Sequence, residues 1–359
     1  MNTDSINTAT MRSGSAGAGG ISTNPHVRTF AWLLKREFWE HRGGFMRAPF
    51  IIAIVIICLF VAGLITADVS AHRTGVNIGG LNIGAVADKM SPDAADKVAA
   101  GLDAGLFAMC MPIMIGLTFV TFFYLLGALY DDRRDRSVLF FKSLPISDTT
   151  TVLSKVVSAL LIAPLFAVAA SIALNIVFLL LTTAYTLVHG MNIIALIWRP
   201  SHLLGLWLKL ILLIPINALW ALPTVGWVLL CSAYVRSKPF LAAVLLPILV
   251  GFVVNWVNVM QAFALPSMAY WRYGFFRIVL SLIPGSWVCA TSADGVTVDT
   301  SGSAISIGLG KLDFLNGVIS INRMLGILLT PELWIGVAAG AALIAAAIYF
   351  RQKRTEAYS

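Results

Sequence analysis

Charged residues are scarce in this sequence. Asp, Glu, Lys and Arg make up only 12% of its 359 residues, whereas an ordinary soluble domain carries about 25%. Hydrophobic residues make up 58%, and apolar runs of roughly 20 residues, each long enough to cross a bilayer as a helix, recur along the chain. The composition argues against a soluble enzyme and predicts an all-α membrane protein surrounded by the lipid bilayer.

Cysteine is also scarce, and the histidines lack the spacing of metal ligands. Most of the cysteines fall inside apolar runs, so no disulfide framework or CxxC metal site is indicated, and burial as small apolar side chains is their expected role. The cysteines are Cys58, Cys110, Cys231 and Cys289, and the histidines are His26, His41, His72, His189 and His202.

A phosphate-binding loop is missing. Lys311 follows Gly310 in the only Gly-Lys pair, but Ile305 stands where the first glycine of a P-loop belongs, and Leu312 where its hydroxyl residue belongs. The interiors of the predicted spans hold no Asp, Glu or His, which disfavours a proton-relay transporter. We therefore expect no catalytic residue, cofactor or metal in this chain. If the chain moves a substrate, we expect the energy to come from another subunit.

A polar tail precedes the apolar part of the chain. Residues 1–26 are rich in Ser, Thr, Gly, Ala and Asn and are expected to form a disordered cytosolic tail. Residues 27–42, VRTFAWLLKREFWEHR, predict an amphipathic elbow helix at the membrane interface, with Trp32 and most other apolar residues on one face. The elbow residues that we single out are Lys35, Arg36, Trp39, Glu40 and Arg42, with Trp39 on the apolar face and the charged residues opposite. The glycine pair at 43 and 44 then allows a sharp turn.

Residues 27–359 are expected to form one membrane domain with six transmembrane helices. The segment 261–330 is less regular, because the apolar run from Tyr273 to Ala290 is interrupted by Arg277, Pro284 and Gly285. A re-entrant or interfacial pair of half-helices is therefore expected there instead of a seventh span. The predicted spans are about 48–67, 105–130, 156–187, 206–235, 240–260 and 331–350.

The basic residues orient the predicted spans. With the N-terminus inside, most Lys and Arg residues, including those of the segment RQKR after the last span, fall on the inner side, as the positive-inside rule requires. We therefore expect both termini in the cytosol and a location in the cell membrane, most simply a bacterial inner membrane. Orientation also explains the net charge of +8 without a nucleic-acid partner.

The most unusual segment is YDDRRDRSVLFFKSLPISDTTTVLSK, from Tyr130 to Lys155, which places mixed charges beside two adjacent phenylalanines. One interpretation is that the phenylalanines rest in the lipid interface and the arginines set topology. The other is a docking element that presents aromatic and arginine side chains, both typical of binding hot spots, to a cytosolic partner. Ser147 is expected to cap the following helix. The candidate docking residues are Arg133, Arg134, Asp135, Arg136, Phe140, Phe141, Lys142, Pro145 and Asp148.

The chain resembles the permease subunits of ABC-2 type exporters. The resemblance depends on the six spans and on two segments, RTFAWLLKREFWEHR and DRRDRSVLFFKSLPISDTTTVLSK. The resemblance implies a coupling helix from Arg133 to Lys142, its exit from Pro145 to Asp148, and a contribution of the elbow from Lys35 to Arg42. It also implies a dimer with a second permease copy or paralogue, bound to two separate ATP-binding subunits that hold ATP and Mg.

The expected function is therefore the translocation path of an ATP-driven exporter, not an enzyme. Two alternatives remain open: an ATP-independent secondary transporter or channel, and a membrane anchor or assembly protein without a path. No residue indicates the transported substrate.

Overall fold

The computed structural model describes residues 25–74, 92–135, 146–189, 203–259, 270–287, 298–299, 306–307 and 321–356. The prediction of an all-α membrane protein with six spans is confirmed. Among these residues the strands are β1 (Val298–Asp299) and β2 (Ser306–Ile307), which pair antiparallel. Six helical stretches are long and apolar enough to cross a membrane: Val27–Thr74, Gly101–Arg134, Asp148–Val188, Leu203–Tyr234, Pro239–Val257 and Pro331–Lys353. The predicted disordered tail lies outside the described residues, apart from Pro25 and His26, whose backbone begins α1.

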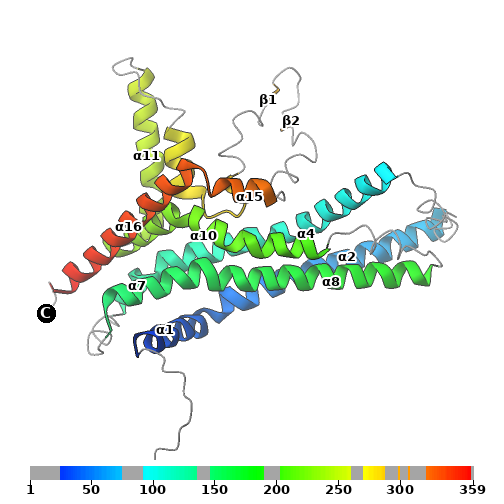
Figure 1. The fold of residues 1–359 in the computed structure, drawn as a ribbon, viewed down its shortest axis with the longest axis horizontal. Helices are drawn as coiled ribbons and strands as arrows, with labels where there is room; N and C mark the ends of the chain where they lie inside the picture. The colour runs from blue at the N-terminus through cyan, green and yellow to red at the C-terminus, as the bar shows by residue number, and fades with distance from the viewer. Residues whose placement is uncertain are drawn as a thin grey trace, which may run out of the picture.

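The first helices follow one another without a loop: α1 (Pro25–Arg42), the π-helical η1 (Gly43–Arg47) and α2 (Ala48–Thr74). The backbone of His41 leaves the helical region, with φ −108° and ψ 17°, and η1 begins at the expected glycine pair. Figure 1 shows α2 along the long axis and α1 turned away from that direction at one end of the bundle. The helix is thus kinked at His41, two residues before the glycine pair, whereas the sharp turn at the glycines and the position of α1 at a membrane surface stay predictions.

The middle of the chain forms α4 (Pro92–Ala128), α5 (Tyr130–Arg134), α7 (Asp148–Val157), η3 (Ser158–Ile162) and α8 (Ala163–Val188). The helices α2, α4 and α8 pack side by side (Figure 1). Ser147 caps α7 as predicted, because its Oγ accepts a hydrogen bond from the Thr150 N–H at 3.2 Å. Asp148 lies in the first turn, where a negative charge favours the positive end of the helix dipole.

Two of the last spans, α10 (Leu203–Tyr234) and α16 (Pro331–Glu356), pack most extensively. Glycine makes this possible: a Cβ added at Gly226 would lie 2.6 Å from the carbonyl oxygen of Gly340. A Cβ at Gly340 would lie equally close to the backbone of Leu222. By contrast, α11 (Pro239–Val259) contacts α10 and η4, and at its start Phe240 stacks on Phe123 of α4. The rest of α11 extends away from the bundle in Figure 1.

The segment before the last span contributes the π-helical η4 (Tyr270–Leu280) and the short α15 (Ile321–Ile327). After η4 the chain turns near the expected break, with Gly285 at φ 84°. Glycine tolerates this left-handed conformation because it lacks a Cβ. Apart from the turn after η4, the three residues that follow α15, and the strands β1 and β2, the rest of this segment is outside the described residues, and its re-entrant character stays a prediction.

Candidate functional site

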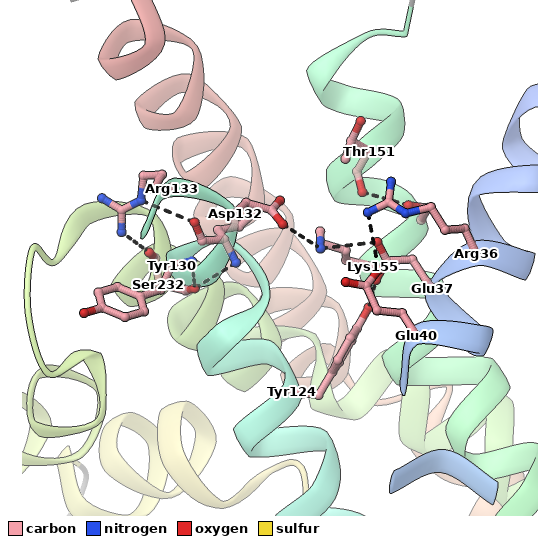
Figure 2. A network of polar contacts seen from close by, with 12 residues as sticks. Arg36, Glu37, Glu40, Tyr124, Tyr130, Asp132, Arg133, Thr151, Lys155 and Ser232 are labelled. Atoms are coloured by element: carbon pink, nitrogen blue, oxygen red, sulfur yellow. Dashed lines mark hydrogen bonds and ion pairs between the residues drawn. The ribbon is translucent and has the colours of Figure 1, made fainter. Parts of the chain in front are cut away.

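Oppositely charged side chains from distant parts of the sequence meet at the end of the bundle that carries α1. Lys155, on α7, lies between two carboxylates (Figure 2). Its Nζ is 3.2 Å from Oε1 of Glu37 on α1 and 3.5 Å from Oδ1 of Asp132 on α5. The side chains of Lys155 and Glu37 are only 4% and 2% exposed. This interaction therefore joins α1, α5 and α7 through buried charges.

Arg351 extends the cluster to α16. Its Nη1 is 3.6 Å from Oδ2 of Asp132, and its Nε is 3.1 Å from Oδ1 of Asp148, at the start of α7. Asp132 thus lies between two cations that come from different helices. We call Glu37, Asp132, Asp148, Lys155 and Arg351 the ionic network.

The second oxygen of the Glu37 carboxylate also has partners. The Tyr124 hydroxyl, on α4, donates a hydrogen bond of 2.9 Å to Oε2. Nδ1 of His41 lies 4.0 Å from the same oxygen, and the His41 ring packs edge-on against the Tyr124 ring with centroids 4.6 Å apart. Glu37 is therefore held from α4 as well as from α7.

Burial makes the ionic network sensitive to any change in geometry. Removing an ion from water costs several kcal/mol, and its partners offset that cost only when the distances are short. Loss of one partner leaves a buried charge uncompensated, which typically costs about 3–5 kcal/mol. The network therefore favours one arrangement of α1, α5, α7 and α16.

Arg133, a predicted docking residue, has partners within the bundle. Its Nε donates to the Leu129 carbonyl at 3.3 Å, and its Nη2 donates to the carbonyls of Ser232 and, at 3.0 Å, Val235. The Ser232 hydroxyl in turn accepts hydrogen bonds from the backbone N–H groups of Leu129 and Tyr130. Arg133 thus satisfies carbonyls at the C-terminal end of α10, where a cation is favoured.

The other predicted docking residues divide into three groups. Arg134 and Asp135 are exposed at the end of α5. Asp148 belongs to the ionic network. Outside the described residues lie Arg136, Phe140, Phe141, Lys142 and Pro145.

The elbow residues require a correction. Trp32 and Trp39 are 63% and 55% exposed, and they share the exposed face of α1 with Lys35 and Arg42, whose charged groups lie over the two rings. The prediction that the tryptophans lie opposite these charges is wrong. The buried face of α1 instead includes Glu37, because the carboxylate is compensated there by Lys155. On the flank of the helix, Arg36 and Glu40 form an ion pair of 3.4 Å.

A second polar cluster holds η4 against the spans. The Arg277 guanidinium is only 8% exposed and lies 3.6 Å from the ring centroid of Trp220. Its Nη1 donates to the Trp220 carbonyl at 3.1 Å, and its Nη2 to the Glu332 carbonyl at 3.3 Å. Gly336 leaves room for this guanidinium, since a Cβ there would overlap Nη2. Arg277, which interrupts the apolar run from Tyr273 to Ala290, therefore anchors η4 to α10 and α16.

Comparison of the chain with protein-family models, with curated proteins and with solved structures found no match. The functional proposal therefore depends on the residues of this chain and on the resemblance described above.

Sequence reasoning did not single out Glu37, Asp132, Lys155 and Arg351 as interacting residues. One signal was present: Glu37 follows Leu33 by four residues and Leu34 by three, which places it on the apolar face of a helix. A charge at such a position calls for a buried partner. The identity of that partner, Lys155, depends on the tertiary fold.

Proposed function

We propose that this chain is the membrane permease subunit of an ATP-driven ABC exporter. A separate ATP-binding subunit binds its cytosolic face and supplies ATP hydrolysis with Mg, and a second permease copy or paralogue completes the translocation path. The observation that carries the proposal is the ionic network, because it joins both ends of the connection between α5 and α7 to other helices.

The connection between α5 and α7 is suited to receive a force. Asp132 precedes it and Asp148 follows it, and both contact Arg351 of α16. Lys155, one helix segment further on, contacts Glu37 of α1. A displacement of the connection would therefore reach the first and last helices of the domain together. The side chains of Lys155 and Arg351 are each only 4% exposed, so these contacts are largely shielded from water.

The proposed docking surface is narrower than the sequence alone suggests. Arg133 is engaged with α10, so we assign docking to Arg134, Asp135 and the residues that follow them up to Pro145. The pair Arg36 and Glu40, on the flank of α1, is the proposed contribution of the elbow.

A charge-reversal experiment tests the proposal. The double variant Arg134→Glu/Arg136→Glu changes the docking surface and leaves Arg133 intact. The matched control is Arg236→Glu/Lys238→Glu, which also reverses two exposed basic residues. These residues lie on the connection that follows α10, close to the carbonyls that Arg133 contacts. Each full-length protein is purified in mild detergent with its native partners, and a copurifying P-loop protein is identified and assayed for ATP hydrolysis.

The proposal predicts that such an ATPase copurifies with the wild type and the control and is lost from the docking variant. Absence of an ATPase from the wild type, together with transport that needs no ATP, would instead identify a secondary transporter or channel. A stable cytosolic partner without ATPase activity would identify a membrane anchor or assembly protein. Equal ATPase recovery with both double variants would refute the assigned docking surface.

A further inference from the structure

The exposed face of α1 carries alternating basic and tryptophan side chains. Arg28, Trp32, Lys35, Trp39 and Arg42 follow one another at intervals of four, three, four and three residues, and all five are exposed. At about 100° per residue, this spacing confines them to about a quarter of the helix circumference. We call them the cation–tryptophan stripe.

The stripe lies opposite the face that packs against the protein. Glu37 and Leu33 are buried there, and α1 contacts α7 and η3. No acidic residue belongs to the stripe, and the nearby exposed acid, Glu40, is paired with Arg36. The stripe therefore presents positive charge without an acidic residue among its members.

The tryptophan rings and the cations are arranged in pairs. Nζ of Lys35 is 4.9 Å from the ring centroid of Trp32, and Cζ of Arg42 is 5.5 Å from that of Trp39. A cation over a ring retains further N–H groups that can donate to an oxygen acceptor. Tryptophan favours the level of the lipid headgroups, where its ring is partly in hydrocarbon and its N–H is near water.

We propose that the cation–tryptophan stripe binds the phosphate groups of anionic phospholipids in the leaflet next to α1. Phosphate oxygens complement the basic residues, and the glycerol and upper acyl regions contact the rings of Trp32 and Trp39. Each basic residue near an anionic surface contributes about 1 kcal/mol, so removal of one lowers the preference for anionic lipid about fivefold. This proposal is independent of the ATP-binding partner.

Fluorescence quenching by brominated lipids tests the stripe in the full-length protein. The protein is reconstituted in mixed phosphatidylglycerol and phosphatidylcholine, with bromine on the chains of one lipid or of the other. The difference between the wild type and Trp32→Phe/Trp39→Phe isolates the quenching of these two rings. The same difference is measured in the background of the stripe variant Arg28→Gln/Lys35→Gln/Arg42→Gln.

A matched control removes the same number of exposed basic residues elsewhere, at the α10–α11 connection and the end of α16. It is Arg236→Gln/Lys238→Gln/Lys353→Gln. In the wild type and the control, we expect brominated phosphatidylglycerol to quench the two rings more than its mole fraction in the bilayer predicts. In the stripe variant, this preference for phosphatidylglycerol over phosphatidylcholine should be at least about fivefold lower. Salt at 1 M, where the Debye length is about 3 Å, should also reduce the preference in the wild type.

Equal quenching by both lipids in the wild type would overturn the proposal, as would an equal loss of preference in the control variant. A third outcome would also overturn it. If the stripe variant keeps its lipid preference but loses a copurifying protein, the stripe binds that protein. The salt titration uses the wild type alone, so the proposal remains testable even when a variant fails to insert.

Discussion

Substitution of Lys155 by Met should strongly destabilise the fold. Methionine keeps an unbranched side chain of similar length but removes the charge that lies 3.2 Å from Glu37 and 3.5 Å from Asp132. Asp132 retains Arg351, whereas among the described residues Glu37 retains only the Tyr124 hydroxyl as a close partner outside α1. Breaking a buried ion pair on one side typically costs about 3–5 kcal/mol, and we expect a loss in this range.

A double-mutant cycle measures how much of that loss belongs to the pair. Lys155→Met, Glu37→Gln and the double variant are unfolded reversibly by SDS in mixed micelles, and tryptophan fluorescence reports the transition. The double variant removes both charges, so its loss in free energy of unfolding should be smaller than the sum of the losses in the two single variants. Coupling of about 0.5–3 kcal/mol is typical of residues in direct contact.

Lys353→Met is the control for the charge and side-chain type, because Lys353 is exposed near the C-terminal end of α16. Surface substitutions usually change stability by no more than about 0.5 kcal/mol. A loss below about 1 kcal/mol for Lys155→Met, or costs that add without coupling, would refute the claim that these charges are a buried, interdependent network.

Two further predictions concern contacts away from the network. Gly336→Ala should lower the free energy of SDS unfolding by about 1–3 kcal/mol, because its Cβ displaces the Arg277 guanidinium. The loss should shrink in an Arg277→Met background, whereas Gly63→Ala, where the added Cβ meets nothing within 4 Å, should cost little. The backbone of Tyr185 and the Asp68 carboxylate raise the pKa of His189 above its ordinary 6.5. The stability from this contact is therefore full below about pH 6.5 and is lost as pH rises through the folded-state pKa, so thermal stability should fall with pH more in the wild type than in His189→Gln.

The six spans could be predicted because the bilayer leaves few choices. A segment without polar partners must satisfy its backbone internally, so a long apolar run is almost always a helix. The ends of the helices are predicted less well from apolar runs. The helix α4 already begins at Pro92, and α7 at Asp148, both well before the predicted spans. Hydropathy marks the part of a helix inside the membrane, not the whole helix.

The ionic network could not be predicted, because its members are far apart in sequence. Glu37 and Lys155 are brought together only when α1 packs against α7. Each charge, taken alone, has an adequate local explanation; Arg351, for example, also fits the positive-inside rule. The orientation of Arg133 depends equally on where α10 ends, which no local pattern shows.

The two faces of α1 have separate roles: one packs against the helix bundle, and the other is proposed to bind lipid. Glu37 attaches one face to α7, whereas the cation–tryptophan stripe is proposed to attach the opposite face to anionic lipid. A helix held on both sides resists sliding along the membrane, so a displacement of α7 would be passed to α2 instead of being lost as movement of α1. Two variants already described, Lys155→Met and the stripe variant, separate these attachments. Lys155→Met should weaken the response of the spans to the proposed ATP-binding partner while the lipid preference persists. The stripe variant should lower the lipid preference at least about fivefold while the ion pair to Glu37 remains.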